Sequence, residues 1–210
     1  MSHSNALCGL LLTCLPLTLP ATLAQTPQVL TESGPISGTR EAGLTIYKGI
    51  PFAAPPTGEL RFKPPTSPKS HDGVLNATKY GPQCMQTSSG SASIFYTGSE
   101  QMSEDCLYLN IWTPTYDDDE DLTSKNLPVY YWIYGGRYEM GSGDVKTYDG
   151  SGLAIKDIIV VTVNYRVGAF GYFAHPELSA ESAHNSSGNY GTLDQIAGLK
   201  VITLFRSVRR

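Results

Sequence analysis

A glycine pair, Gly135-Gly136, follows an apolar and aromatic run in the stretch PVYYWIYGGRYEMGSG, residues 128–143. The β-prone residues of this run, Val129 to Tyr134, predict a strand that is buried on both faces. Glycine frees the backbone to turn tightly, so the pair exposes its own N–H groups at the end of that strand. The chemistry open to such a turn is hydrogen-bond donation from the main chain, and the charged Arg137 comes directly after it.

Cysteines are the next residues with chemistry of their own. Cys8 and Cys14 lie in an apolar leader, whereas Cys84 and Cys106 remain as an even pair in the rest of the chain. In an oxidising compartment this pair would form one disulfide that closes a short loop and contributes about 3 kcal/mol. Two free buried thiols are the alternative.

Two further patterns concern modification and metal binding. Asn76-Ala77-Thr78 and Asn185-Ser186-Ser187 are N-glycosylation sequons, which matter only in a secreted eukaryotic protein. The acidic run DDDED at 117–121 predicts a solvated loop rather than a calcium site, because it lacks the alternating spacing and the glycine of a calcium loop. No metal site is predicted.

The elements around the glycine turn follow from periodicity. Residues 27–50 predict a small meandering hairpin, and the proline-rich residues 49–65 predict an ordered, irregular crossing. Residues 80–103 predict a long loop that the disulfide would clamp. Residues 105–114 alternate and end at a proline, which predicts a strand.

A second apolar strand is predicted over 157–168, and helical spacing begins after Gly188 with Leu193, Ile196 and Ala197. Fully apolar strands are typical of a parallel sheet covered by helices. The order of strand, loop, strand and helix predicts an α/β architecture.

Composition sets limits on the class of protein. The chain has 210 residues, of which 40% are hydrophobic and 16% charged, with a formal net charge of −4. These values are ordinary for a globular protein. A mildly acidic chain without a basic patch has no electrostatic footprint for nucleic acid, so no nucleic-acid partner is expected.

The first 24 residues are expected to be a secretory signal peptide cut after Ala24, with a signal anchor as the alternative. The segment is apolar, contains no Asp, Glu, Lys or Arg, and is interrupted by Pro16 and Pro20. No later segment approaches the roughly 18 apolar residues of a membrane helix. The remaining chain is therefore expected to be secreted and to have no membrane contact after cleavage.

Four separated blocks carry a resemblance to a known family. They are GIPFAAPPTGELRF (49–62), EDCLYLNIW (104–112), VVTVNYRVGAFGYF (160–173) and GNYGTLDQ (188–195). In this order they resemble the type-B carboxylesterases, the cholinesterase-like branch of the α/β-hydrolase fold. The resemblance covers roughly residues 27–200, which we assign as the N-terminal part of one carboxylesterase domain, residues 25–200.

The resemblance implies a role for the glycine turn. In such esterases, the backbone N–H groups after this strand bind the oxyanion of a tetrahedral acyl intermediate, and losing one donor costs on the order of 3 kcal/mol. This assigns Gly135, Gly136 and Arg137 to the oxyanion hole. The family usually has glycine at position 137, so a positive φ there would strain the arginine by about 1–2 kcal/mol. Its side chain could point outward and leave the donor intact, or point into the pocket and favour acidic substrates.

Other positions match structural features of the family. The resemblance implies ion pairs that are buried and fix geometry, together with a disulfide around the loop over the pocket mouth. They are Arg61 with Glu104, Arg166 with Asp194, and Cys84 with Cys106. Tyr134 and Tyr138 could face the acyl pocket, although an aromatic residue at a strand end is more often part of the core.

The chain lacks the other half of such a site. The chemistry needs a serine in a G-x-S-x-G elbow, and no serine here has that spacing. GSGD (141–144) and DGSG (149–152) predict plain turns. His71, His175 and His184 precede the expected serine, which contradicts the order Ser…Asp/Glu…His, so they are predicted to be surface residues. The expected fold is an incomplete α/β-hydrolase fold without the nucleophile strand.

Residues 201–210, VITLFRSVRR, do not resemble the family's usual continuation and predict an atypical tail, as a frameshift or an intron would give. Without the nucleophile strand, the run 129–134 would become an unprotected apolar edge.

We expect a secreted serine esterase family member that acts on a small carboxylic ester in its complete form, without a cofactor, and is inactive as these 210 residues. The alternative is a non-catalytic, cholinesterase-like binding or adhesion protein. A carbohydrate-binding module would require Trp132 and the tyrosines to be exposed.

Overall fold

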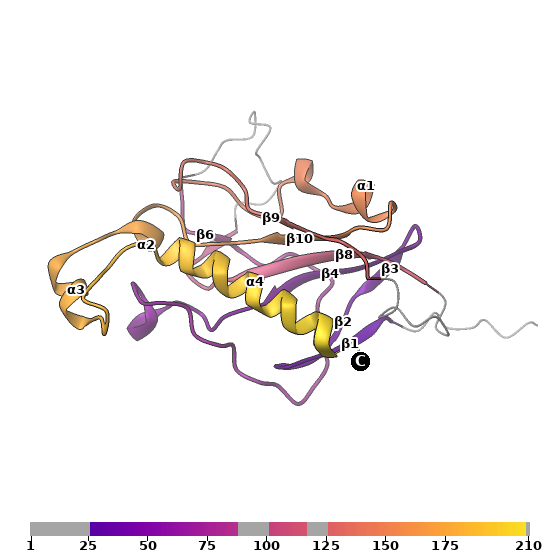
Figure 1. Cartoon of the computed structure of the whole chain (residues 1–210), viewed down its shortest axis with the longest axis horizontal. Helices are drawn as coiled ribbons and strands as arrows, with labels where there is room; N and C mark the ends of the chain where they lie inside the picture. Colours follow the sequence, from indigo (N-terminus) through magenta and orange to yellow (C-terminus); the bar gives the residue numbers. More distant parts are fainter. Residues whose placement is uncertain (1–25, 88–100, 117–125, 209–210) are drawn as a thin grey trace, which may run out of the picture.

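A computed structural model describes residues 26–87, 101–116 and 126–208 of the chain (Figure 1). The expected signal peptide and the acidic run 117–121 lie outside these residues. The short strands β6 (Gln83–Cys84) and β7 (Met102–Ser103) pair in parallel at the two ends of the predicted loop 80–103, whose middle is also outside the description.

Two hairpins begin the described chain, which confirms the prediction for residues 27–50. β1 (Gln28–Thr31) and β2 (Gly34–Ser37) are antiparallel, and β5 (Leu75–Asn76) joins β2 in a small sheet of order β1-β2-β5. β3 (Thr39–Glu41) and β4 (Leu44–Pro51) form the second hairpin. The proline-rich crossing follows β4 with a single 3-10 turn, η1 (Gly58–Leu60), as its regular element.

The main sheet has five strands in the order β3-β4-β8-β10-β9. β8 (Tyr108–Pro114) and β10 (Ile159–Val163) are buried, as the apolar runs 105–114 and 157–168 predict. The sheet is mixed: β8 runs antiparallel to both β4 and β10, and the β9–β10 pair is parallel. The expectation of a parallel sheet is therefore right for β9 and β10 and wrong for the rest.

The strand β9 (Val129–Trp132) is shorter and more exposed than predicted. It lies at the edge of the sheet and pairs only with β10 among the described strands. Tyr130 and Ile133 are each 43% exposed. Burial on both faces was a wrong prediction because the elements that pack on the two faces of the sheet leave side chains at this edge partly uncovered. The apolar edge that was expected at 129–134 without a further strand is present in the described sheet.

Helices cover both faces of the sheet. α4 (Tyr190–Val208) crosses one face from the α2 side toward β1, as Figure 1 shows in yellow. The other described helical elements are α1 (Ser151–Ala154), α2 (Gly168–Tyr172), α3 (Pro176–Glu181) and the 3-10 turn η2 (Lys146–Tyr148). The predicted helix after Gly188 is confirmed, and its backbone continues through most of the expected tail. In the described ranges, no helix is both long enough and apolar enough to cross a membrane.

The core has two parts, one for each face of the sheet. Val161 and Val163 belong to the larger cluster, which includes Ile202 of α4. Val160 and Trp112 belong to the smaller cluster, which includes Ala154 of α1. Successive side chains of a strand point to opposite faces, so β10 contributes to both clusters.

Candidate functional site

The turn after β9 has an unusual backbone conformation. Gly136, Arg137 and Tyr138 have φ values of 131°, 59° and 65°, so three consecutive residues have positive φ. A Cβ at Gly136 would lie 2.0 Å from the carbonyl oxygen of Met140, which only glycine avoids. At Gly135 the same atom would meet nothing within 4 Å. The turn therefore depends on the second glycine of the pair and not on the first.

Hydrogen bonds on both sides fix this turn. The Gly136 carbonyl accepts from the N–H groups of Glu139 (3.0 Å) and Met140 (3.3 Å). The Tyr138 carbonyl accepts from the N–H of Gly168 at 2.6 Å, at the start of α2. These bonds engage the carbonyls. Across the described ranges, the N–H groups of Gly136 and Arg137 donate to no protein acceptor.

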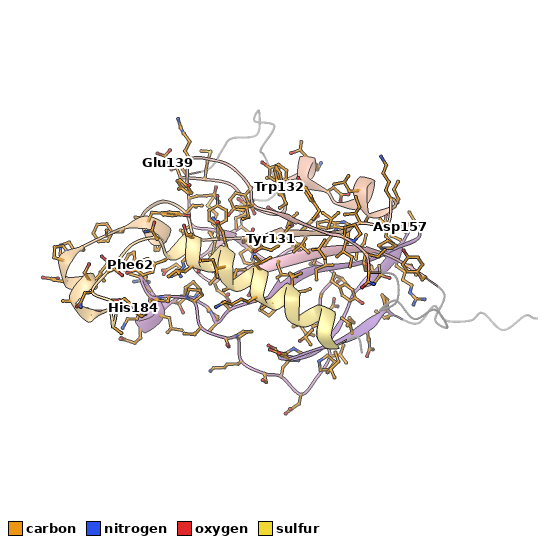
Figure 2. All side chains as sticks on the ribbon, viewed as in Figure 1. Phe62, Tyr131, Trp132, Glu139, Asp157 and His184 are labelled. Atoms are coloured by element: carbon orange, nitrogen blue, oxygen red, sulfur yellow. A yellow bond between two sulfur atoms is a disulfide. The ribbon has the colours of Figure 1, made fainter. Side chains whose placement is uncertain are left out.

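The Arg137 side chain points to solvent. It is 87% exposed, and its Nη2 lies 3.6 Å from the carboxylate of Glu139, which lies at the outer edge of the molecule in Figure 2. This is the outward orientation, which leaves the backbone donor intact. The positive φ of 59° gives the expected strain of about 1–2 kcal/mol. The reading in which the guanidinium enters a pocket has no support in this geometry.

Two tyrosines flank the turn in different environments. Tyr134 is 2% exposed and its ring stacks on Tyr165 with centroids 4.3 Å apart. The Tyr134 hydroxyl donates to the Tyr165 carbonyl (3.0 Å), and the Tyr165 hydroxyl donates to the Tyr134 carbonyl (2.7 Å). Burial raises the pKa of Tyr134 well above its usual value. Tyr134 is therefore a core residue that attaches the end of β9 to the chain after β10.

Tyr138 is exposed beside the turn, with 59% of its surface accessible. Its ring lies 4.8 Å from that of Tyr172 in α2. Of the two tyrosines considered for an acyl pocket, it alone has an accessible side chain.

The sequence patterns did not predict a buried polar network that lies behind the turn. The Asn164 Oδ1 accepts from the Ser142 hydroxyl (3.2 Å) and the Gly143 N–H (2.8 Å). The Thr162 hydroxyl donates to the Gly143 carbonyl (2.8 Å) and accepts from Asn110 Nδ2 (2.9 Å). Ser142 is 1% exposed. The predicted turn at 141–144 is present at Gly143 and Asp144, but it is more than a surface turn, because hydrogen bonds fix residues 142–143 to Thr162 of β10 and to Asn164. Polar residues inside two apolar strands were the available signal.

Asp144 continues the same segment in a partly buried position. Burial raises the pKa of its carboxyl, and hydrogen bonds from Ser142 and Gln83 act in the opposite direction. One carboxyl oxygen, Oδ1, is buried without a protein partner in the described structure.

Both expected ion pairs are present, and they differ in burial. Arg166 donates from Nε and Nη2 to the two carboxylate oxygens of Asp194, each at 2.8 Å, and both side chains are buried. Burial raises the pKa of the Asp194 carboxyl, whereas its hydrogen bonds and charge contact with Arg166 act in the opposite direction.

Arg61 and Glu104 make two hydrogen bonds of 2.6 Å but are 44% and 25% exposed. Burial was thus the wrong expectation for this second pair, which lies where the proline-rich crossing meets solvent. The Arg61 guanidinium lowers the pKa of Glu104.

The remaining candidate residues lie as follows. Cys84 and Cys106 form a disulfide across 22 residues, and each is 1% exposed. Both sequon asparagines, Asn76 and Asn185, are exposed, as are His175 and His184, whereas His71 is only partly exposed. Within the described ranges, no three His, Cys, Asp or Glu side chains group as a metal site would need.

The turn has the chemistry of an anion-binding loop. Two adjacent main-chain donors lie at the end of a strand, in a backbone that is fixed before any ligand arrives. Donors of this kind stabilise a developing negative charge on oxygen without reorganising. Within the described ranges, Ser142 offers no nucleophile to this turn, because its hydroxyl is buried and donates to Asn164 Oδ1.

Comparisons with known proteins agree on one family. A sequence model of the carboxylesterase family matches residues 25–204. The para-nitrobenzyl esterase of Bacillus subtilis is 47% identical over 173 residues, which are 82% of this chain and 33% of that protein. The fumonisin B1 esterase of Sphingopyxis macrogoltabida is 45% identical over 170 residues, 81% of this chain and 30% of that protein. The human cocaine esterase is 39% identical over 188 residues, 86% of this chain and 31% of its own.

Solved structures agree with the sequence relatives. A PNB esterase structure superposes with a TM-score of 0.75 at 42% identity and covers 86% of this chain and 35% of its own. A Geobacillus stearothermophilus carboxylesterase structure superposes with a TM-score of 0.71 at 42% identity and covers 84% of this chain and 34% of its own. The chain therefore has the α/β-hydrolase fold over about a third of the length of these relatives.

Proposed function

The chain belongs to the carboxylesterase family, and we propose that its Gly135–Arg137 turn is the oxyanion-binding part of a carboxylic-ester hydrolase. The observation that carries this proposal is the pair of N–H groups of Gly136 and Arg137, which have no protein acceptor in the described structure. A small carboxylic ester is the substrate class that such a turn serves. Its carbonyl oxygen gains negative charge when a nucleophile attacks, and the two donors stabilise that charge.

The complete reaction needs residues that this sequence does not contain. A serine would attack the ester carbonyl, and a histidine would take the serine proton and later return it to the leaving alcohol. No serine of the 210 residues lies in a G-x-S-x-G elbow. We therefore expect these 210 residues alone to hydrolyse no ester. The reaction by this route requires no metal and no organic cofactor.

Secretion is part of the proposal and has three supports. Residues 1–24 have the composition of a signal peptide. Cys84 and Cys106 are disulfide-bonded, which is typical of an oxidising compartment. Asn76 and Asn185 are exposed and therefore accessible to glycosylation.

A chimera tests the oxyanion proposal. Residues 25–200 would replace the matching third of the Bacillus subtilis para-nitrobenzyl esterase, which supplies the rest of the protein, and hydrolysis of p-nitrophenyl butyrate would be measured. The proposal predicts turnover that disappears when the serine of the relative's elbow becomes alanine. A folded chimera without turnover would contradict it.

The 210-residue chain would be assayed in parallel. No turnover above a heat-treated control is the expected result, and a burst of nitrophenol would contradict the proposed inactivity. If the chain is folded but inactive, its role would be in binding, as in a non-catalytic relative. That role would be tested by measuring which partners the chain retains.

A further inference from the structure

One terminal nitrogen of a buried guanidinium has no acceptor. Arg166 is 3% exposed and uses Nε and Nη2 to bind Asp194, at 2.8 Å each. Its other terminal nitrogen, Nη1, is also buried and has no hydrogen-bond partner in the described structure. Burying a charged donor without an acceptor is unfavourable, so such groups in folded proteins usually have a partner.

A small cavity is lined in part by Arg166. Its volume is about 10 Å³, and Arg166, Arg61, Glu104 and the disulfide line it. A single water molecule needs about 10–15 Å³ and two to four polar partners. The cavity is therefore the size of one water and too small for a phosphate or an acyl group.

We propose that one water molecule binds in this cavity, accepts a hydrogen bond from Arg166 Nη1 and donates one to the Glu104 carboxylate. Glu104 already accepts two hydrogen bonds of 2.6 Å from Arg61. A carboxylate has about four acceptor sites, so it can accept a further bond from the water. The water joins the two ion pairs into one hydrogen-bonded network, in the order Asp194, Arg166, water, Glu104, Arg61.

This hydrogen-bonded network would connect four separate segments of the polypeptide. Asp194 lies in α4, Arg166 follows β10, Glu104 follows β7, and Arg61 lies in the proline-rich crossing. The water would thus link the disulfide-closed loop to the sheet.

Thermal unfolding in an Arg61→Gln background tests this link, because the direct partner of Glu104 is then removed. Adding Glu104→Met should lower Tm by a further 2–4 °C or so, the shift expected for one lost hydrogen bond in a chain of this size. The matched control is the exposed pair Lys63–Glu181, whose ions are 3.9 Å apart. There, Glu181→Met in a Lys63→Gln background should leave Tm unchanged. Equal shifts at both pairs, or none at Glu104, would overturn the proposal.

A crystal structure of the unaltered chain, soaked in bromide, provides a second and independent test. The proposal predicts an ordered water within hydrogen-bonding distance of Arg166 Nη1 and a Glu104 oxygen, without anomalous signal. An anomalous bromide peak would assign the site to an anion. An Nη1 that bonds a protein acceptor would also overturn the proposal.

Discussion

The guanidinium of Arg166 and the carboxylate of Asp194 join the end of β10 to the first turns of α4 through two hydrogen bonds of 2.8 Å. Both side chains are almost fully buried, at 3% and 0% exposure. The Asp194 carboxylate also accepts from the Arg166 backbone N–H at 3.0 Å. Gly168, two residues further on, donates to the carbonyl of Tyr138, so the chain that carries this pair is bonded to the residue next to the Gly135–Arg137 turn.

Breaking this pair on one side should be more costly than replacing both partners. Asp194→Asn leaves a buried guanidinium without its counter-charge, and we expect a loss of about 3–5 kcal/mol in the free energy of unfolding. The double variant Arg166→Met/Asp194→Leu should lose less, because no charge remains buried. Urea unfolding measures both. A double variant that is as unstable as Asp194→Asn, or less stable, would contradict the account.

Relief of backbone strain is predicted at position 137. Arg137 has a φ of 59°, so Arg137→Gly should raise the free energy of unfolding by up to about 1 kcal/mol. The control is Glu139→Gly, two residues away at a position without positive φ, which should lose roughly 0.5–1 kcal/mol. Denaturant titration compares the two variants, and a loss of stability in both would show that the strain is absent.

The disulfide should contribute strongly to stability. Cys84 and Cys106 close a loop across 22 residues, for which loop entropy predicts about 3 kcal/mol. The variant Cys84→Ser/Cys106→Ser should unfold at correspondingly lower urea concentration. It should also become insensitive to reductant, whereas the unaltered chain should lose stability when reduced. Equal stability of the oxidised and reduced unaltered chain would contradict this assignment.

Alkaline pH should unfold the protein through its buried phenols. Burial and the neighbouring Asp105 raise the pKa of Tyr108 to about 12, above the value of about 10 in an unfolded chain. A raised phenol pKa stabilises the folded state below pH 10 or so, and this stabilisation disappears as pH rises through the folded pKa. Near-ultraviolet absorbance of tyrosinate and circular dichroism should therefore change together between about pH 10 and 12. Tyr108→Phe should flatten the pH dependence, and ionisation in a protein that stays folded would contradict the prediction.

The exposed edge of β9 should promote self-association. Tyr130 and Ile133 are each 43% exposed on or beside an edge strand without a charged residue between 129 and 134. Ile133→Lys places a charge at this edge and should increase the monomer fraction in sedimentation. Ile155→Lys is the matched control, since Ile155 is 62% exposed and lies after α1. An equal effect of both substitutions would indicate general solubility rather than edge pairing.

Local patterns predicted much of this fold. The apolar runs that became β8 and β10, and the helical spacing after Gly188, were visible because each is set by its own side-chain periodicity. The disulfide was predicted from the even pair of cysteines and again from the family resemblance, whereas the ion pairs came from the resemblance alone, which supplies spatial partners that a single sequence does not contain.

Non-local relations were the features that the sequence could not predict. β9 has the composition of a buried strand, but its burial depends on its position in the sheet and on which elements pack over that position. Asn164 and Thr162 resemble ordinary members of an apolar run, and their bonds to residues 142–143 exist only after the chain folds. The outward direction of Arg137 likewise depends on the left-handed turn and on Glu139.

The oxyanion role of the turn is the central claim, and kcat/KM of glycine variants in the chimera tests it most directly. Gly136→Ala would place a Cβ 2.0 Å from the Met140 carbonyl, whereas Gly135→Ala meets nothing within 4 Å. We predict that Gly136→Ala lowers kcat/KM by about 10²–10³, as losing one oxyanion donor does, while Gly135→Ala retains most of the activity. Equal activity of the two variants, both folded, would contradict the assignment of this turn to the oxyanion site.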